Sequence, residues 1–339
     1  MNVLFHDLPL NLKLSFYLKI FADQMSLDFL YGWGYVLEFE DEEGLLVKVN
    51  GSKRHIRSDA VCVELDGEGT LTVKSIREAI KRKIRISVKS KHGRVMLDPH
   101  PLVINQVSKF LNDEERIKVS RAVTQAASLN KLYVLKLLGL KGCEEYLKIE
   151  RLMDELAKSS TVWGLMSIEA EVAKSYYEAL RRIIPSEYGF TARSRRPPRD
   201  PVSASISFLN MMLYQICARA LRYYGLDERI GFLHEPRGER ASLALDLAEE
   251  FKQPLVDAAV IPAFTSRSMK KWHFTYSING VFLNKRGMSK MLKLFRHRLN
   301  LRTSKGRLEE QIYLQASKLA EWVLGLRKNY EPFILTLEV

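Results

Sequence analysis

The stretch RVMLDPHPLVINQVSKF, residues 94–110, marks the point where one hydrophobic pattern gives way to another. Before it, apolar residues form short runs rich in β-branched and aromatic side chains, and turn pairs such as Asn50-Gly51 separate them. After it, apolar residues recur at steps of three and four residues, which is the period of a helix. The sequence therefore predicts an α+β fold, with a β-rich domain at 25–100 and a larger, mostly α-helical domain at 101–339.

Helices are expected in both domains. In the β-rich domain, KSIREAIKRK at 74–83 places Ile76 and Ile80 on one helical face. Between two helices of the second domain, RSRRPPRDP at 193–201 is expected to form a basic loop. The apolar period predicts helices near 102–112, 114–139, 144–158, 163–184, 202–224, 242–258, 287–299 and 308–326.

The chain carries an excess of positive charge. Lys and Arg number 53 against 40 for Asp and Glu, a net charge of +13, and this favours a polyanionic partner because binding releases counterions from phosphates. An anionic membrane surface is the competing interpretation. No stretch of roughly 18 uncharged apolar residues is present, and the N-terminus lacks the pattern of a signal peptide. Three cysteines without a CxxC pair argue against a disulfide framework, so we expect a cytoplasmic protein without a membrane span.

Two carboxylates in SLALDLAEEF, residues 242–251, share one face of an expected helix. Asp246 and Glu249 stand three residues apart, close enough to hold one cation. The alternative is a solvated acidic face, in which Lys252 pairs with a neighbouring carboxylate. The spacing by itself does not choose between these interpretations.

Two further candidates come from different segments. His234 ends the apolar run of IGFLHEP, where a histidine is more often a hydrogen-bonded structural residue than a ligand. Glu169 borders the apolar stripe of MSIEAEVAKSYYEAL. Glu171 and Glu178 are equally acidic, so composition leaves the choice among three glutamates open.

Taken together, these side chains indicate a divalent-metal site in a basic protein. Carboxylates and an imidazole can share Mn²⁺ or Mg²⁺. Such an ion polarises a phosphoryl oxygen and activates an attacking hydroxyl, which points to chemistry on nucleic-acid strands. The motifs GxxxxGK[ST], GxSxG and HExxH are absent from the sequence, so a P-loop hydrolase, a serine hydrolase and a zincin lose their usual support.

Basic residues gather at 193–199 and at 285–307, where they can contact phosphates. Aromatic side chains nearby can stack on bases. The alternative is a solvated basic face, or arginines paired with glutamates. The aromatic candidates are Tyr176, Tyr177, Trp272, His273 and Phe274. The basic candidates are Arg193, Arg195, Arg196, Arg199, Lys252, Lys285, Arg286, Lys290, Lys293 and Arg296.

The order of these motifs resembles the Cas-one family of CRISPR-associated endonucleases and integrases, which act in spacer acquisition. The similarity covers about residues 26–335. The segments that carry it are SIEAE at 167–171, RSRRPPRDPVSAS at 193–205, GLDERIGFLHEP at 225–236, SLALDLAEEFKQP at 242–254, VFLNKRGMSKML at 281–292 and the ending Tyr330-Glu331-Pro332-Phe333.

The resemblance implies a set of metal ligands. It places them on Glu169, His234 and Asp246, with Glu249 as a further ligand or supporting carboxylate of one Mn²⁺ or Mg²⁺ ion. It selects Glu169 over Glu171, because Glu169 follows Ile168 as the family's ligand follows its isoleucine. Lys252 stands where the family commonly has arginine, so the charge is kept and the bidentate fork is lost.

The resemblance also implies partners and a reaction. The β-rich domain is expected to form a homodimer, and two such dimers are expected to flank a dimer of the Cas-two protein in a heterohexamer. The complex is expected to bind double-stranded DNA, both protospacer and CRISPR repeat. A 3′-hydroxyl of the protospacer then attacks a phosphodiester of the array, and water in its place makes the site a nuclease.

Three alternatives stay open. The alternative functions are a non-catalytic nucleic-acid-binding subunit, a stand-alone structure-specific nuclease, and a transposon-borne integrase relative. Residues 1–24 have no counterpart in the resemblance, which suggests an extension or an overlong start before Met25.

Overall fold

A computed structural model describes residues 27–40, 44–49, 52–56, 62–82, 84–90, 93–96, 101–303 and 306–335. The chain divides into two compact units, Met1–His100 and Pro101–Val339, and each is described by itself. The suggested extension at 1–24 lies outside the described residues.

The first unit is built on a mixed sheet. Within its described part, the strand order is β3-β2-β1-β4-β5-β6. Strand β1 pairs parallel with β4, and β4 pairs parallel with β5, whereas the outer pairs are antiparallel. A parallel pair needs a crossover connection, and α2 supplies it between β4 and β5. The elements are β1 (Leu27–Glu40), β2 (Gly44–Val49), β3 (Ser52–His55), β4 (Cys62–Leu71), α2 (Val73–Lys81), β5 (Arg85–Ser90) and β6 (Gly93–Met96).

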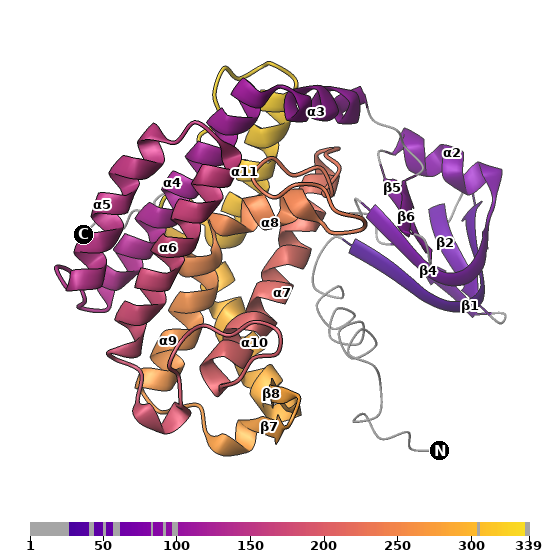
Figure 1. Cartoon of the computed structure of the whole chain (residues 1–339). Helices are drawn as coiled ribbons and strands as arrows, with labels where there is room; N and C mark the ends of the chain where they lie inside the picture. Colours follow the sequence, from indigo (N-terminus) through magenta and orange to yellow (C-terminus); the bar gives the residue numbers. More distant parts are fainter. Residues whose placement is uncertain are drawn as a thin grey trace. The chain divides into compact units, whose positions relative to one another are not determined.

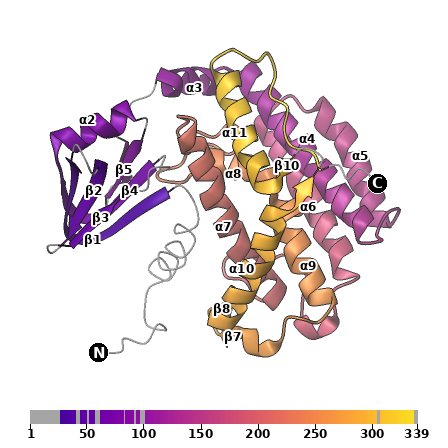
Figure 2. The same cartoon turned by 180° about the vertical axis from the view of Figure 1, so that it is seen from behind.

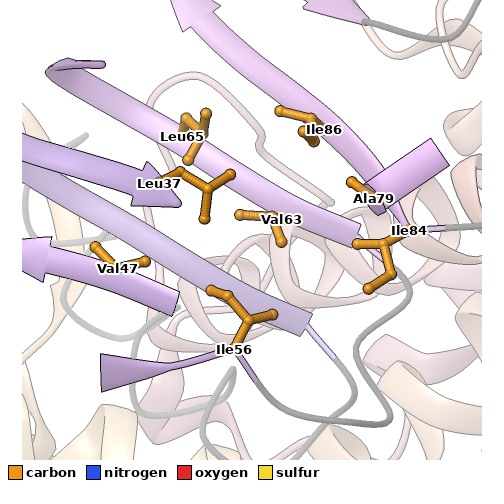
Figure 3. Packing of buried hydrophobic residues seen from close by; sticks show 8 residues of the cluster. All are labelled: Leu37, Val47, Ile56, Val63, Leu65, Ala79, Ile84 and Ile86. Carbon is orange, nitrogen blue, oxygen red and sulfur yellow. The ribbon is translucent and has the colours of Figure 1, made fainter. Parts of the chain in front are cut away.

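One face of this sheet carries the core of the first unit. Val63 and Leu65 stand two residues apart on β4, so both side chains point to the same face. Leu37 of β1 and Ile86 of β5 join them from the two flanking strands, and Ala79 of α2 packs on the cluster (Figure 3). Helix α2 therefore covers this face, as its apolar period predicts.

The second unit is mostly helical, which confirms the predicted α+β fold (Figure 1). Its long helices begin at residues suited to the role: Asp200 caps α7 by accepting the backbone N–H of Ser203 at 2.7 Å, and Pro201 follows at the first helical position. The helices are α3 (Pro101–Leu111), α4 (Asp113–Leu137), α5 (Glu144–Lys158), α6 (Val162–Arg181), α7 (Pro201–Tyr223), α8 (Ser242–Glu249), α9 (Ala258–Thr265), α10 (Lys285–Asn300) and α11 (Leu308–Val323).

Helices α4, α6, α7 and α8 pack together and position the candidate site. Helix α4 contacts both α6 and α8, and α7 contacts α8. Helix α7 is buried along most of its length, and α10 and α11 lie next to it (Figure 2). In the described part of the chain, no helix is long and apolar enough to cross a membrane.

The structure departs from the predicted helices after residue 249. The helix expected at 242–258 is divided into α8, a π-helical turn at Lys252–Asp257, and α9. Pro254 lies inside the turn and has no N–H to donate, so the regular α-helical hydrogen bonds cannot continue through it.

Short strands also occur in the second unit, which was predicted to be mostly helical. Strands β7 (Phe274–Ser277) and β8 (Gly280–Leu283) form an antiparallel hairpin. Strands β9 (Arg302–Thr303) and β10 (Gly306–Arg307) form a second small pair before α11.

Candidate metal centre and nucleic-acid interface

Asp246 of α8 is buried under the turn that carries His234. Its Oδ2 accepts the backbone N–H groups of Phe232 at 2.6 Å and Leu233 at 3.0 Å. Its Oδ1 accepts the backbone N–H of His234 at 2.9 Å and lies 2.7 Å from Nδ1 of the same residue. Only glycine fits at 231, because a Cβ there would lie 2.4 Å from the carbonyl oxygen of His234. The carboxylate thus organises the whole turn.

The contact with Asp246 orients the imidazole of His234. Since Nδ1 faces the carboxylate, Nε2 is the nitrogen left to bind a ligand, and the side chain is 22% exposed. Burial lowers the pKa of His234, but the hydrogen bond and the charge of Asp246 outweigh it, so the pKa lies above its ordinary value. Metal-binding histidines commonly have a carboxylate on the second nitrogen in this way.

Glu249 lies one turn beyond Asp246 and is also buried. Lys252 Nζ lies 2.5 Å from its Oε1. Burial raises the pKa of Glu249, but the positive charges of Lys252 and Lys131 outweigh it and bring the pKa to about 2. Glu249 is therefore ionised at neutral pH.

Glu169 on α6 is the third carboxylate, and a buried lysine joins it to the others. Lys131 of α4 is 2% exposed, and its Nζ lies 3.5 Å from Oε1 of Glu169. The charge of Lys131 also lowers the pKa of Glu249, and the charge of Glu169 raises the pKa of Lys252. The electrostatic coupling therefore runs across α4, α6 and α8. In contrast, Glu171 pairs with Lys148 at the surface, so the geometry favours Glu169.

The sequence-based interpretation missed Lys131. A charged residue inside the apolar run of α4 was the available signal, because a buried lysine needs an acidic partner. The interpretation also missed Asp257, which ends the π-helical turn. Burial raises the pKa of Asp257 to about 6, against the lowering influence of Tyr176, Arg193 and Lys131.

The candidate residues carry the donor types that a hard divalent cation takes, but their side chains do not surround one point. Among the described residues, no three His, Cys, Asp or Glu side chains form a ready-made metal cage. Lysine ammonium groups lie against both glutamates instead, at Glu169 and at Glu249. Ionised carboxylates and an imidazole with one oriented nitrogen are nonetheless the ligands that Mn²⁺ takes, and carboxylates are those that Mg²⁺ prefers.

A second feature is the contact between the basic loop at 193–199 and the β7–β8 hairpin. The backbone N–H of Val281 donates to the carbonyl oxygen of Pro198 at 2.9 Å. Gly280 has φ of +118°, and a Cβ there would lie 2.6 Å from the same oxygen. Because only glycine allows this approach, the contact depends on residue 280. It joins the basic loop to a hairpin about 80 residues further along the sequence, which Lys271 precedes and Lys285 follows.

The basic loop at 193–199 and the β7–β8 hairpin, with Trp272 just before it, form what we name the composite basic surface. It exposes cations and aromatic rings. Arg195, Arg196 and Arg199 are exposed, and no hydrogen bond or ion pair links their guanidinium groups to the part of the chain that the structure describes. Trp272 is 64% exposed and Tyr276 is 53% exposed, so both rings are available for stacking.

The other candidates differ in burial and in their contacts. Tyr176 and Phe274 are buried, so the expectation that they stack on bases was wrong. Lys252 pairs with Glu249. Arg193 donates to Ser207 Oγ at 2.8 Å, and Lys290 donates to the carbonyl oxygen of Ser268. Lys285, Arg286 and Lys293 are exposed, whereas Tyr177, His273 and Arg296 are half-buried.

Comparison with known families decides what kind of protein has this geometry. The family model described as CRISPR associated protein Cas1 matches residues 32–297, which is more than half of the chain. The chain belongs to the Cas1 family. This confirms the resemblance drawn from the motifs.

Curated relatives of the Cas1 family match most of the chain. A CRISPR-associated endonuclease Cas1 from Thermus thermophilus is 30% identical over 325 residues, which cover 88% of this chain and 96% of the relative. Another, from Methanothermobacter thermautotrophicus, is 33% identical over 241 residues, 69% of this chain and 70% of the relative.

Solved structures share the fold. A Cas1 protein from Thermotoga maritima has a TM-score of 0.67 and 24% identity, covering 90% of this chain and 99% of that chain. A casposase bound to integration product has a TM-score of 0.68 and 23% identity, covering 93% and 96%. The Cas1 fold thus extends over both units.

Proposed function

We propose that this chain is a divalent-metal-dependent DNA endonuclease and integrase of CRISPR adaptation. The observation that carries the proposal is the coupled set of Glu169, the oriented His234 and the ionised Glu249, held on three adjoining parts of the helical unit. The curated relatives, which are named CRISPR-associated endonucleases, support it.

The metal ligands in this proposal are Glu169, Nε2 of His234, and Glu249. Asp246 orients the histidine rather than binding the ion, because its two oxygens already face three backbone N–H groups and the imidazole. This exchanges the roles that the motif order suggested for Asp246 and Glu249. A bound Mn²⁺ or Mg²⁺ would polarise the scissile phosphate and lower the pKa of the attacking hydroxyl.

The other residues prepare the site for that chemistry. Lys131 and Lys252 stabilise the negative charge of Glu249, so the carboxylate stays ionised at neutral pH. Asp246 accepts the Nδ1–H of His234, so in the neutral imidazole the lone pair of Nε2 is available to a ligand. A 3′-hydroxyl of DNA at this site would join strands, and water would cut them.

The composite basic surface is the proposed DNA contact. Exposed arginines of the loop contact phosphates, and Trp272 and Tyr276 contact unpaired bases. Two solved chains of similar fold support DNA and Cas2 as partners: the casposase bound to integration product, and a chain in a Cas6-RT-Cas1–Cas2 complex. We propose a homodimer through the β-rich unit and assembly with a Cas2 dimer.

A half-site integration assay tests the proposal. The assay joins an oligonucleotide with a free 3′-hydroxyl to a CRISPR leader–repeat duplex, with and without Mn²⁺ and with and without Cas2. We expect joining only with the metal, and loss of joining in His234→Ala and Glu249→Gln. Glu171→Ala is the control. Glu171 lies on α6 two residues after the proposed ligand Glu169, but it pairs with Lys148 at the surface. Undiminished joining by His234→Ala contradicts the proposal.

The casposase fold favours a second candidate, a transposon-borne integrase. The two candidates differ in the DNA that they join. Insertion of protospacer-length duplexes that depends on Cas2 indicates adaptation. Insertion of transposon terminal inverted repeats without Cas2 indicates the transposon role.

A further inference from the structure

The segment at 330–335 returns to the candidate site from the far end of the chain. After α11 it comes to lie beside α4, as the yellow trace in Figure 2 shows, and it contacts the residue that follows Glu249. Its side chains Tyr330, Phe333 and Leu335 are all buried. We name residues 330–335 the C-terminal clamp.

The clamp holds the side chain of Glu250 at both oxygens. Tyr330 donates its hydroxyl to Oε1 at 2.6 Å, and the backbone N–H of Phe333 donates to Oε2 at 2.6 Å. Glu250 is fully buried. Burial raises the pKa of Glu250 to about 8, so the restraint comes from the geometry of the contacts and not from a charge. Because hydrogen bonds are directional, two of them on one carboxyl group fix how the end of α8 is rotated about its axis.

The clamp also holds α4, through a single buried asparagine. Asn130 Nδ2 donates to the carbonyl oxygen of Glu250 at 2.8 Å and to that of Phe333 at 3.1 Å. Asn130 Oδ1 accepts the backbone N–H of Leu335 at 2.7 Å. Nearby, the ring of Phe251 stacks on that of Phe333, with centroids 4.9 Å apart. The clamp, α4 and the end of α8 therefore form one connected unit.

The neighbours of these anchors face the candidate metal centre. Glu249 precedes Glu250, and Lys131 follows Asn130. Consecutive residues on a helix point about 100° apart, so an anchor held on one side sets the direction of its neighbour on the other. The clamp therefore restrains the backbone that carries Glu249 and Lys131, and Lys131 in turn contacts Glu169.

We propose that the C-terminal clamp is a positioning element of the metal centre. Through Glu250 and Asn130 it fixes Glu249 relative to Glu169, and so it sets the affinity for the divalent ion. The inference rests on the proposed function. It predicts that a change in the clamp, remote from the ligands in sequence, weakens metal binding without weakening DNA binding.

The test compares two tyrosine-to-phenylalanine variants of the full chain. Tyr330→Phe removes one hydrogen bond to Glu250 and keeps the ring. Tyr188→Phe is the matched control, because Tyr188 is equally buried and donates its hydroxyl to Met269 at 2.7 Å, a contact outside the clamp. Glu250→Gln is a second clamp variant that keeps the shape of the side chain.

The readouts separate metal affinity from folding. One is the Mn²⁺ concentration at which the metal-induced rise in Tm is half complete, and another is DNA affinity in EDTA. We expect the clamp variants to need about tenfold more Mn²⁺, as changes to groups that hold a ligand in place often do. Tyr188→Phe should keep the wild-type midpoint, and DNA affinity should stay unchanged in every variant.

Three results overturn the inference in different ways. If the clamp variants keep the wild-type Mn²⁺ midpoint while His234→Ala abolishes the rise in Tm, the clamp does not position the site and the proposed function stands. If Mn²⁺ changes neither the Tm nor the joining activity of the wild type, the proposed function fails and the clamp fails with it. An equal shift in Tyr188→Phe shows a general effect of stability and also refutes the clamp.

Discussion

Replacement of Asp246 by alanine separates an orienting carboxylate from a metal ligand. In the folded chain, Asp246 faces the backbone N–H groups of Phe232, Leu233 and His234, and also the imidazole. A residue whose main role is to bind a metal is dispensable for folding without the metal. An orienting residue with these contacts is not, so Asp246→Ala should unfold more easily even in EDTA.

The magnitude follows from the donors left without a partner. A buried donor that loses its partner costs about 1–3 kcal/mol, so three backbone N–H groups at the low end give about 3 kcal/mol. The loss of a buried charge from a hydrogen-bonded network falls in the same range, about 3–5 kcal/mol. This is a large share of the roughly 5–15 kcal/mol that holds a typical domain folded.

The assay is urea unfolding in EDTA, monitored by circular dichroism, with the unfolding midpoint and the dependence of the free energy of unfolding on urea fitted together. Glu239→Ala is the control, since Glu239 is an exposed carboxylate 4.0 Å from Arg229, and we expect it to change stability by less than about 0.5 kcal/mol. A loss below about 1 kcal/mol in Asp246→Ala would refute the orienting role.

Three further predictions follow from the described contacts. Gly280→Ala should separate the hairpin from the basic loop, because its Cβ would lie 2.6 Å from the Pro198 carbonyl oxygen, and DNA binding measured by filter binding should weaken. Gly139 also has a positive φ but has open space around it, so Gly139→Ala should bind DNA normally. Arg195→Ala combined with Arg196→Ala should lower the slope of log K against log salt by about 2, since each exposed arginine neutralises one phosphate, whereas Lys158→Ala should leave the slope unchanged. Asp257 has a pKa of about 6 in the folded chain against its ordinary 3.8, so the folded chain holds this proton more tightly than the unfolded chain. The protonated group therefore stabilises the fold at low pH, and this stabilisation is lost as pH rises from about 4 to above 6. Urea unfolding should therefore show the wild type losing about 2 kcal/mol more than Asp257→Asn between pH 4 and pH 7, and parallel pH profiles would contradict this.

Local patterns were sufficient for the fold class, whereas the choice of the candidate site residues needed the resemblance to a family. The change of period after Asp98-Pro99 separates strands from helices because side-chain burial repeats every two residues in one and every 3.6 in the other. The prediction failed locally at 242–258, where Pro254 interrupts a continuous apolar period by removing a backbone donor. The period records which side chains are buried, not whether the backbone hydrogen bonds continue.

Only the tertiary structure distinguishes the surroundings of the candidate site residues, on which the proposed roles rest. Asp246 and Glu249 are equivalent by spacing, and what distinguishes them is that the turn before α8 folds over one carboxylate and leaves the other beside Lys252. In the same way, Glu169 differs from Glu171 because a buried lysine of α4 reaches it. The joining of the basic loop to the hairpin and of the C-terminal clamp to Glu250 depends on contacts between residues about 80 apart in the chain. Periodicity and spacing describe a residue's own element, whereas orientation and charge at a site depend on the elements that pack against it, and only the folded chain brings those together.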